Sequence, residues 1–586
     1  MLRYFLFLIL SLLSIYQSPA QYILLDKVDP VLVDRYKTKI VNEYIVLMKD
    51  RVVFNDPLKL ASKSEKAFYV YKALLQKAVI TQKPIISFLL KSDIPYQSFI
   101  ITNALKVTST SDIMKILANR DDVEQIIDNG AFRMLDYSVN NENTSLRNIE
   151  PEWNLKMIKA DSVWLMGFKG GGVTIAGQDT GYDWQVSPLQ SKYRGFKDSM
   201  NVNHNFNWHD AIHKNSPNYP DSLINSCGYN LKFPCDDSNH GTHTMGIMVG
   251  EDTNNKIGVA PDSKWIGCRN MDRGWGQPST YLECFEWFLA PYDNDIKNAN
   301  PAQAPHVINN SWYCSTEEGC NPSNFILMEN AVKNLKASGI VVVASAGNSG
   351  PECASVTGPP AFFGPTFSVG ATSGSDIIAS FSSRGPVNID SSMRIKPNVS
   401  APGVAIRSVI RNGAFASYNG TSMAGPHVAG LVALMISANP ALAGKVELIE
   451  NIIEATCVPK VSDQNCNNFS GSSIPNVVYG FGRIDALAAV KQALAIRSDT
   501  KEYLITKSLK ITPNPATEFV QIAIDSANEG IHDIKIYDLS GKMILNKTLE
   551  FPLISMELNL ASLREGIYFC QVSSGKNHYS AKIIKL

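Results

Sequence analysis

The sequence has no excess of charge of either sign. It contains 54 basic and 54 acidic residues, so its formal net charge at pH 7 is zero. Because a protein that binds nucleic-acid phosphates needs a basic excess, we expect no nucleic-acid partner. Fixed-period repeats and long low-complexity tracts are also missing, which excludes a solenoid. At 586 residues and a hydrophobic fraction of 45%, the chain is predicted to fold into about two to four domains.

Long apolar runs are scarce. The clearest one covers residues 4–16 and is shorter than the roughly 20 apolar residues that a membrane-spanning helix needs. Arg3 precedes this run and small residues up to Ala20 follow it, which is the pattern of a secretory signal. We predict a signal peptide over residues 1–20 that is cut before Gln21. We expect no membrane-spanning segment after its removal, since no later segment meets the requirement.

Ten cysteines suit the oxidising compartment that such a signal leads to. Close spacing suggests three disulfides and a fourth candidate, whereas Cys353 and Cys570 are left without a nearby partner. The alternative is that the cysteines are reduced and buried. The expected disulfides are Cys227–Cys235, Cys314–Cys320, Cys457–Cys466 and, as the fourth candidate, Cys268–Cys284.

Residues 21–150, which follow the signal, have the pattern of a small α+β unit. The strand-like segments are residues 43–49, 98–105 and 123–127, and residues 67–78 show helical spacing of apolar side chains. Ser109 and Asp112 have the spacing of a capping box and predict the start of a second helix. The order of strand, helix, strand, helix and strand predicts a ferredoxin-like fold. A polar stretch at residues 140–145 then predicts an exposed, cleavable linker.

Residues 151–497 form the largest segment and predict an α/β domain. Continuous apolar runs, such as residues 173–176 and 339–344, are typical of parallel strands that are buried on both faces of a sheet. Helical patterns cover residues 324–337 and 423–438.

The pattern changes again near the C-terminus. Residues 498–508 are predicted to be a linker, and residues 509–586 alternate apolar and polar side chains between turn signals. This alternation predicts a small C-terminal β-sandwich.

Three positions in the large segment carry polar residues where the local pattern is apolar. Asp179 ends a buried strand, His240 lies at the start of a Gly-containing helix, and Ser422 precedes a nearly all-apolar helix. Pro426 is best tolerated in the first turn of a helix, which places Ser422 at the helix mouth. A hydroxyl, an imidazole and a carboxylate are the groups that acyl transfer requires. Their order along the chain, and the absence of a Gly-x-Ser-x-Gly motif, disfavour a lipase or esterase.

Acyl transfer also requires hydrogen-bond donors for the oxyanion that develops in the transition state. The strand that ends near Ala346 places the side-chain amide of Asn348 at the edge of the sheet. We expect this amide and the backbone N–H of Ser422 to be the two donors.

These blocks resemble the signature sequences of subtilisin-type serine peptidases. The matching blocks are Asp179-Thr-Gly181, His240-Gly-Thr-His243, Gly420-Thr-Ser-Met-Ala-Gly-Pro-His427, Ala346-Gly-Asn348 and Lys396-Pro-Asn-Val-Ser-Ala-Pro-Gly403. The resemblance covers about residues 153–495, and residues 264–271 and 283–289 are similar to the bacillopeptidase F subgroup. It implies a subtilisin-like parallel-sheet fold and a secreted serine endopeptidase with protein or peptide substrates. Asp179, His240 and Ser422 would be its triad and Asn348 its oxyanion donor.

The resemblance also explains the flanking segments. Residues 21–150 resemble an inhibitor-type propeptide, which implies an intramolecular inhibitor that is later cut off, near residues 136–150. Residues 509–586 are similar to the C-terminal sorting domain of type IX (Por) secretion. We therefore expect the type IX machinery as a partner. The destination would be the cell surface or the medium, reached through Sec export and the periplasm.

Matching positions also indicate the residues that contact substrate. A segment that pairs with the substrate backbone would be followed by the walls and floor of the primary specificity pocket, and none of these residues is charged. Tyr313 stands where the family has Gly, which is expected to narrow the outer subsites. We expect cleavage after uncharged residues. The expected contact residues are Ser311, Trp312, Tyr313, Ala344, Ser345, Ala346, Gly347 and Gly358.

Other interpretations of these residues are open. Ser422 alone is a common helix-capping residue type, and the chain could be a catalytically inactive, surface-attached binding protein on a peptidase scaffold. His204, His209 and His213 cluster in sequence, and the last two have helical i,i+4 spacing that could serve a zinc ion. A structural calcium ion is common in the family, yet the loop at residues 250–256 is short. We assign no cofactor and no metal-binding residues, and we expect His243 and His427 to be structural.

Overall fold

A computed structural model describes the chain in eleven ranges: residues 26–54, 62–133, 138–142, 148–215, 225–313, 321–496, 509–524, 531–538, 542–553, 555–574 and 577–586. The predicted signal peptide, the predicted linker at residues 498–508 and the Cys314–Cys320 pair lie outside these ranges. The chain divides into two units, Met1–Ile496 and Arg497–Leu586, and each is described by itself.

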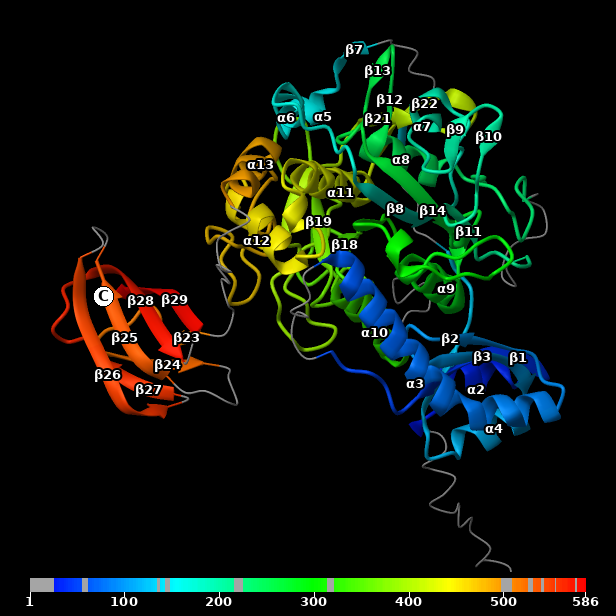
Figure 1. Cartoon of the computed structure of the whole chain (residues 1–586), viewed down its shortest axis with the longest axis horizontal. Helices are drawn as coiled ribbons and strands as arrows, with labels where there is room; N and C mark the ends of the chain where they lie inside the picture. The colour runs from blue at the N-terminus through cyan, green and yellow to red at the C-terminus, as the bar shows by residue number, and fades with distance from the viewer. Residues whose placement is uncertain are drawn as a thin grey trace, which may run out of the picture. The chain divides into compact units, whose positions relative to one another are not determined.

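The first unit begins with a small α+β domain, residues 26–133 of the described chain (Figure 1). Its four antiparallel strands have the order β2-β3-β1-β4, and two helices connect them in the order β1-α3-β2-β3-α4-β4. The structure thus contains one strand more than the sequence predicted. The elements are α2 (Pro30–Arg35), β1 (Val41–Met48), α3 (Lys63–Lys91), β2 (Tyr96–Phe99), β3 (Ala104–Thr110), α4 (Ser111–Ala118) and β4 (Val123–Asp128).

The caps of its two main helices differ from each other. Helix α3 starts with a capping box in which Ser62 and Glu65 bond each other's backbone N–H groups. The predicted capping box of α4 is wrong, because Thr110 precedes that helix and makes no side-chain cap. Ser109 belongs to β3, and its hydroxyl lies 2.6 Å from the Tyr44 hydroxyl, so a strand contact replaced the cap.

The large domain is built on a seven-stranded sheet in the order β11-β14-β8-β17-β18-β19-β20, in which every neighbouring pair is parallel. The parallel α/β fold expected for this segment is therefore correct. The strands are β8 (Thr174–Asp179), β11 (Trp208–Asp210), β14 (Lys264–Arg269), β17 (Val307–Asn310), β18 (Val341–Ser345), β19 (Phe367–Thr372) and β20 (Val399–Pro402).

Alternate residues of these strands enter two different cores, which explains the continuous apolar runs. Val341 and Val343 pack with α8 (His240–Val249) and α11 (Thr421–Ala438) on one face. Val342 and Ala344 pack with α9 (Pro278–Leu289) and α10 (Pro322–Ala337) on the other face.

Helix α11 crosses the face of the sheet and contacts β17, β18, β19 and β20 (Figure 1). It is apolar on all sides, and its 18 residues meet the length and composition of a membrane span, contrary to the expectation from the sequence. Because 89% of that segment is buried inside the fold, it serves as a core helix.

Smaller elements complete the large domain. Its other helices are α5 (Trp153–Met157), α6 (Ala160–Leu165), α7 (Ser187–Gln190), η1 (Pro301–Gln303), η2 (Arg411–Gly413), η3 (Pro440–Leu442), α12 (Val446–Thr456) and α13 (Ala486–Ala495). Its other strands are β9 (Phe196–Asp198), β10 (Asn201–Val202), β12 (Glu251–Asp252), β13 (Asn255–Lys256), β15 (Met271–Asp272), β16 (Trp275–Gly276), β21 (Ile406–Val409) and β22 (Phe415–Asn419).

The segment that connects the two domains pairs with three strands of the large domain. Strand β5 (Phe132–Arg133) pairs antiparallel with β16, and β6 (Ser138–Glu142) pairs antiparallel with β22. Strand β7 (Asn148–Pro151) runs parallel to β13. The connection predicted to be an exposed linker is thus held by backbone pairing in its described residues.

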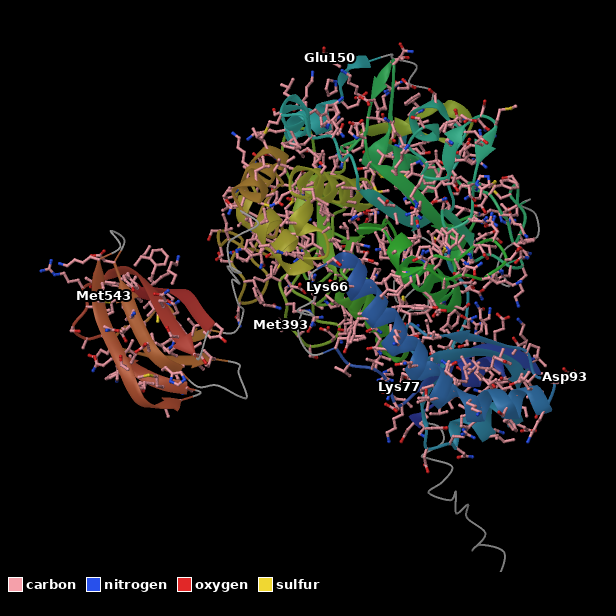
Figure 2. The ribbon with its side chains drawn as sticks, in the orientation of Figure 1. Lys66, Lys77, Asp93, Glu150, Met393 and Met543 are labelled. Atoms are coloured by element: carbon pink, nitrogen blue, oxygen red, sulfur yellow. A yellow bond between two sulfur atoms is a disulfide. The ribbon has the colours of Figure 1, made fainter. Side chains whose placement is uncertain are left out.

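The small domain and the large domain share one apolar core, in which Val70 and Leu74 of α3 join Leu327 and Ala331 of α10. Polar contacts extend along α3. Near the N-terminal end of this helix, Lys66 donates to the carbonyl of Gly444 at 2.9 Å, while Lys77 lies further along it (Figure 2).

The second unit is made of β-strands, as the alternation predicted. A three-stranded sheet in the order β23-β24-β27 and a four-stranded sheet in the order β26-β25-β28-β29 contribute to one apolar cluster. The strands are β23 (Leu509–Thr512), β24 (Phe519–Ile524), β25 (Ile531–Tyr537), β26 (Met543–Leu553), β27 (Ser555–Asn559), β28 (Gly566–Ser574) and β29 (Asn577–Lys585).

The disulfides agree with the predictions only in part. Cys227–Cys235 and Cys268–Cys284 are bonded as expected. The predicted Cys457–Cys466 bond is wrong, because Cys466 is bonded to Cys353, 113 residues away. Cys457 caps the end of α12, where its thiol lies 3.2 Å from the carbonyl of Ile453 and is buried. Cys570 is a free, buried cysteine, as expected.

Candidate active site

The candidate site lies at the carboxyl edge of the parallel sheet. Strand β8 ends at Asp179, and helices α8 and α11 begin at His240 and Thr421. Ligands and substrates of open parallel sheets bind at this edge because the loops that follow the strands converge there.

Asp179 and His240 form a buried pair. The Nδ1 atom of His240 lies 2.7 Å from Oδ1 of Asp179, and neither side chain is more than 2% exposed. A carboxylate only accepts, so Nδ1 carries the proton and Nε2 is the basic nitrogen of the neutral ring. The backbone N–H of Thr180 donates to the same carboxylate oxygen at 2.8 Å, which fixes its orientation.

Ser422 is the second residue of α11, with 7% of its surface exposed. Its hydroxyl donates to the carbonyl of Ser311 at 2.9 Å, and the Ser311 hydroxyl donates to the carbonyl of Ser422 at 2.7 Å. Pro426 lies inside the helix and not in its first turn as predicted. Since Pro426 has no N–H, the Ser422 carbonyl lacks its helical donor, and the Ser311 hydroxyl takes that place.

Asn348 lies beside the start of the same helix. Its side-chain oxygen accepts from the backbone N–H of Thr421 at 2.9 Å and from the Thr421 hydroxyl at 2.8 Å. These two bonds identify which end of the amide is the oxygen, so the NH₂ group of Asn348 is available to donate to another acceptor. A Cβ on Gly420 would lie 3.5 Å from that nitrogen, so the nitrogen faces the Gly420–Ser422 turn. The sequence analysis did not predict that Thr421 orients Asn348, although its position next to Ser422 could have indicated a role in the site.

The predicted substrate-contact residues come from two strand ends. Ser311, Trp312 and Tyr313 follow β17 and are buried, and the Trp312 ring stacks on Tyr281 at 4.1 Å. Ala344 and Ser345 end β18, and Ala346 and Gly347 follow it. Tyr313 joins the two groups, because its ring lies 3.7 Å from where a Cβ on Gly347 would stand. Gly358 lies in a separate turn, where its carbonyl accepts from Ala361.

Two further histidines of the signature blocks are buried. His427 donates through Nδ1 to the Met423 carbonyl at 2.8 Å, so its Nε2 accepts from Asn154 at 2.8 Å, and burial lowers its pKa to about 4. His243 stacks on Tyr418 at 4.2 Å, and burial lowers its pKa to about 3. Both rings are therefore neutral parts of the core.

The histidine cluster considered for zinc is arranged differently from the helical i,i+4 pattern. His209 belongs to strand β11, and both His209 and His213 direct Nε2 to the carboxylate of Glu283, at 2.7 and 2.9 Å. His204 contacts the Tyr193 hydroxyl instead. Within the described residues, no group of three or more His, Cys, Asp or Glu side chains could hold a metal ion.

Comparisons with known proteins agree with this fold, which is of the subtilisin type. Residues 170–482 match the subtilase family, and residues 510–586 match the secretion system C-terminal sorting domain. The chain therefore belongs to the subtilase family, with a secretion sorting domain at its C-terminal end.

Individual proteins with similar sequences are also of the subtilisin type. The chain is 32% identical to bacillopeptidase F of Bacillus subtilis (strain 168) over 406 residues, which are 67% of this chain and 26% of the relative. It is 37% identical to subtilisin amylosacchariticus of Bacillus subtilis subsp. amylosacchariticus over 210 residues, 35% of this chain and 47% of the relative. It is also 32% identical to subtilisin DY of Bacillus licheniformis over 293 residues, 50% and 86% of the two chains. The chain thus spans about a quarter of the first relative and about half of the second.

Proposed function

We propose that this protein is a secreted serine endopeptidase that hydrolyses peptide bonds through Asp179, His240 and Ser422. The observation that carries the proposal is the buried 2.7 Å bond between Asp179 and His240, beside a helix whose second residue is Ser422. Burial of an imidazole and a carboxylate together at the edge of a sheet costs desolvation free energy, and such groups cluster at functional sites.

In the proposed mechanism, the Ser422 hydroxyl attacks the scissile carbonyl carbon while Nε2 of His240 accepts its proton. Asp179 holds the ring in the tautomer that this step needs and stabilises the imidazolium that forms. The Asn348 NH₂ group and the Ser422 N–H donate to the oxyanion. His240 then protonates the departing amine. Water next attacks the acyl-enzyme while His240 accepts its proton, and His240 returns that proton to the Ser422 oxygen as the acid product leaves.

The contact residues suggest the class of substrate. Ala344 and Gly347 at the end of β18, and Tyr313 beside them, bring no charge to the proposed specificity pocket. We therefore propose cleavage after uncharged, apolar or aromatic residues. A peptide-library profile with a strict preference for Arg or Lys at that position would contradict this.

We further propose that the small N-terminal domain is an intramolecular inhibitor whose connection occupies the substrate cleft. Two backbone pairings support this. Arg133 pairs with Trp275 of β16, and Ser138 pairs with Asn419, three residues before Ser422. Asn419 ends β22, and after one further residue α11, which carries Ser422, begins, so the described part of the connection is held next to the candidate site. Antiparallel pairing with enzyme strands is how an extended substrate binds. The proposed cut lies near residues 136–150, as the sequence predicts.

Contacts from helix α9 support retention of this domain after the cut. Glu286 accepts the backbone N–H groups of Ile100 and Ile101 at 2.5 and 2.9 Å, and Glu283 accepts from Gln97 at 2.7 Å. Burial raises the pKa of Glu286 to about 7. Burial acts in the same sense on Glu283, but hydrogen bonds from His209 and His213 lower its pKa overall, so the bond from Gln97 is charge-assisted and stronger than a neutral one.

The C-terminal sorting domain supports the remaining proposal, that export runs through Sec, the periplasm and the type IX machinery to the cell surface or the medium.

The test measures the mass of the secreted protein, which reports loss of the N-terminal domain, together with its hydrolysis of casein. Wild type is expected to lose its N-terminal domain by a cut near residues 136–150 and to hydrolyse casein. Ser422→Ala is expected to keep the domain and to show no hydrolysis. Processing and hydrolysis that persist in Ser422→Ala would refute the proposal, and a folded, inert wild type would favour the surface-attached binding protein.

A further inference from the structure

Asp236 lies four residues before His240 and is 3% exposed, although it takes no part in the proposed chemistry. Its carboxylate accepts five hydrogen bonds. Oδ1 accepts from the Thr180 hydroxyl at 2.9 Å and from the N–H groups of Ser238 and Asn239 at 2.9 and 3.1 Å. Oδ2 accepts from the N–H and the hydroxyl of Thr242 at 3.0 and 2.6 Å. Burial raises the pKa of this carboxyl group, and the donors around it oppose that rise.

These partners belong to two different elements. Thr180 follows Asp179 at the end of β8, and Thr242 lies in the first turn of α8, two residues after His240. The Thr180 hydroxyl also accepts from the N–H of Gly241 at 3.1 Å. Asp236 therefore joins the strand end that holds the carboxylate of the pair to the helix start that holds its imidazole.

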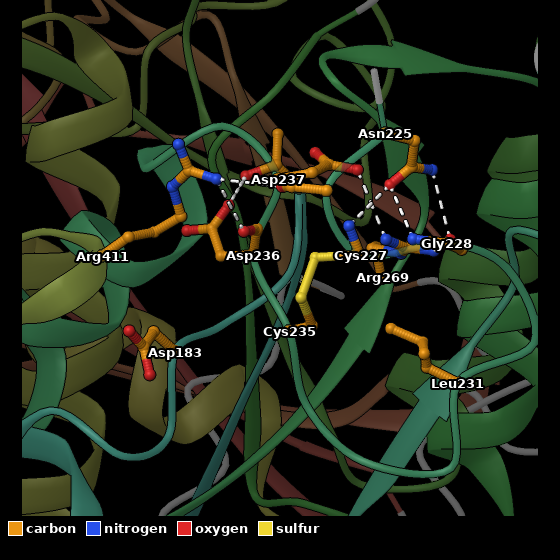
Figure 3. Close-up of a disulfide and its surroundings, with 12 residues drawn as sticks. Asp183, Asn225, Cys227, Gly228, Leu231, Cys235, Asp236, Asp237, Arg269 and Arg411 are labelled. Carbon is orange, nitrogen blue, oxygen red and sulfur yellow. Dashed lines mark hydrogen bonds and ion pairs between the residues drawn. A yellow bond between two sulfur atoms is a disulfide. The ribbon is translucent and has the colours of Figure 1, made fainter.

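The position of Asp236 is itself fixed by the disulfide loop that precedes it. Cys235, bonded to Cys227, lies directly before Asp236 (Figure 3). Gly181 approaches this loop so closely that a Cβ on it would stand 1.8 Å from the Cys235 carbonyl oxygen. Arg411 donates to the backbone carbonyl of Asp236 at 3.2 Å and to the side chain of Asn239 at 2.8 Å.

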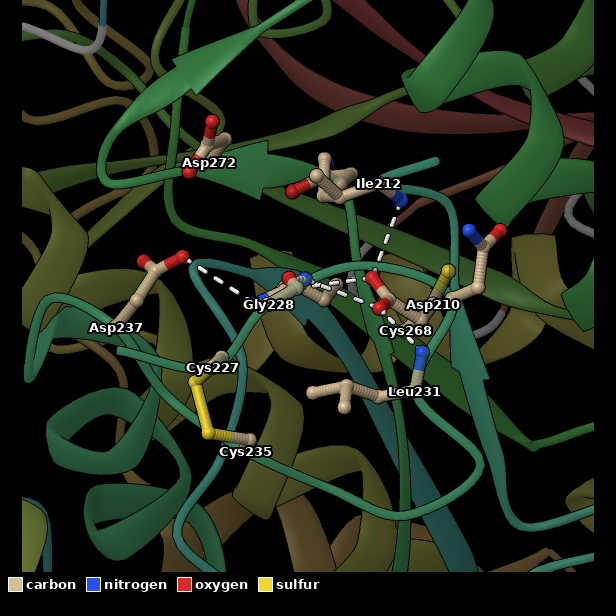
Figure 4. Close-up of polar contacts among 12 residues, drawn as sticks. Asp210, Ile212, Cys227, Gly228, Leu231, Cys235, Asp237, Cys268 and Asp272 are labelled. Carbon is tan, nitrogen blue, oxygen red and sulfur yellow. Dashed lines mark hydrogen bonds and ion pairs between the residues drawn. A yellow bond between two sulfur atoms is a disulfide. The ribbon is translucent and has the colours of Figure 1, made fainter. Parts of the chain in front are cut away.

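A buried arginine holds the other side of the loop. Arg269 ends β14, where its register partner in β8 is Asp179. Its guanidinium bonds both oxygens of Asp210 at 2.9 and 3.0 Å, and it contacts Asp237 at 3.3 Å. Asp210 in turn accepts the N–H of Leu231, within the disulfide loop, at 2.8 Å (Figure 4). The loop is thus anchored to the same sheet edge as the candidate pair.

We propose that Asp236 is a positioning residue of the peptidase, which sets the distance between Asp179 and His240 by joining the strand end to the helix start. This inference rests on the proposed function, since it assigns a role in that reaction. Small displacements of catalytic groups lower turnover by up to about 100-fold.

The experiment compares Asp236→Asn with wild type, each counted by fluorophosphonate titration so that kcat refers to reactive sites alone. Asp236→Asn is expected to lower kcat by about 10- to 100-fold with KM little changed. A merely structural carboxylate would lower the fraction of labelled sites and leave kcat per labelled site unchanged.

Two further variants keep the test decisive. Thr180→Val removes only the hydroxyl that joins the two elements and is also expected to lower kcat. This variant tests the inference even if Asp236→Asn fails to fold. Asp485→Asn is the matched control, because Asp485 is a 5% exposed aspartate that caps α13 through the N–H of Ala488. The control is expected to keep the wild-type kcat per labelled site.

The outcomes separate this inference from the proposed function. A labelled wild type together with Asp236→Asn or Thr180→Val variants of unchanged kcat per labelled site would overturn the role of Asp236 alone. A wild type that folds and is not labelled would overturn the proposed function and this role with it.

Discussion

The orientation of Asn348 gives the sharpest quantitative prediction. Its amide oxygen accepts two bonds from Thr421, one from the backbone and one from the hydroxyl. Thr421→Val removes the hydroxyl and keeps the shape of the side chain. Loss of one neutral hydrogen bond costs about 0.5–1.5 kcal/mol. If that loss is felt in the transition state, kcat falls by about 2- to 13-fold.

Removal of the donor itself has a larger expected effect. Asn348→Ala deletes the NH₂ group that faces the serine turn, and loss of such a donor lowers kcat by about 10²- to 10³-fold. The assay is steady-state hydrolysis of an uncharged peptide substrate, with KM measured separately, because a transition-state donor changes kcat and leaves KM nearly constant. An Asn348→Ala variant that keeps kcat within threefold of wild type, or that changes only KM, would refute this reasoning.

Three other predictions concern stability, inhibition and connectivity. His427 has its pKa lowered to about 4 by burial, while the unfolded chain titrates near 6.5. Its stabilising contribution is therefore complete above pH 6.5 and decreases as pH falls, by about 2 kcal/mol at pH 5. His427→Gln should reduce the loss of stability between pH 7 and pH 5 by that amount in denaturant melts, and an unchanged pH dependence would contradict it. Glu286→Ala leaves two backbone N–H groups unpaired, so the cut N-terminal domain should dissociate about 10-fold faster or more, seen as a shorter lag before full activity; an unaltered lag would count against this contact. Peptide mapping without reduction should recover Cys353 linked to Cys466 and Cys457 as a thiol, and a Cys457–Cys466 peptide would show the assignment to be wrong.

The sequence was sufficient to predict the parts of the site that local rules control. Asp179 ends an apolar strand, His240 begins a helix and Ser422 lies in the first turn of another, so each could be placed on its element from the sequence. The parallel sheet could be predicted for the same reason, because strands buried on both faces, such as residues 341–345, carry no alternation.

The features that were wrong depend on contacts between distant parts of the chain. Cys466 pairs across 113 residues, although Cys457 is much nearer in sequence. Pro426 lies within α11, where the hydroxyl of Ser311 replaces the missing donor by bonding the carbonyl of Ser422, 111 residues further along the chain. The carboxylate of Glu283 contacts both His209 and His213, and the spacing of the histidines in the sequence could not indicate this partner.

Covalent labelling of the mature protein tests the central claim most directly. A fluorophosphonate probe followed by peptide mapping should place one label per molecule on Ser422, and His240→Ala should abolish that label in a folded protein. Absence of label on folded wild type, or full labelling of Ser422 in the His240→Ala variant, would contradict the claim that the imidazole held by Asp179 activates this serine.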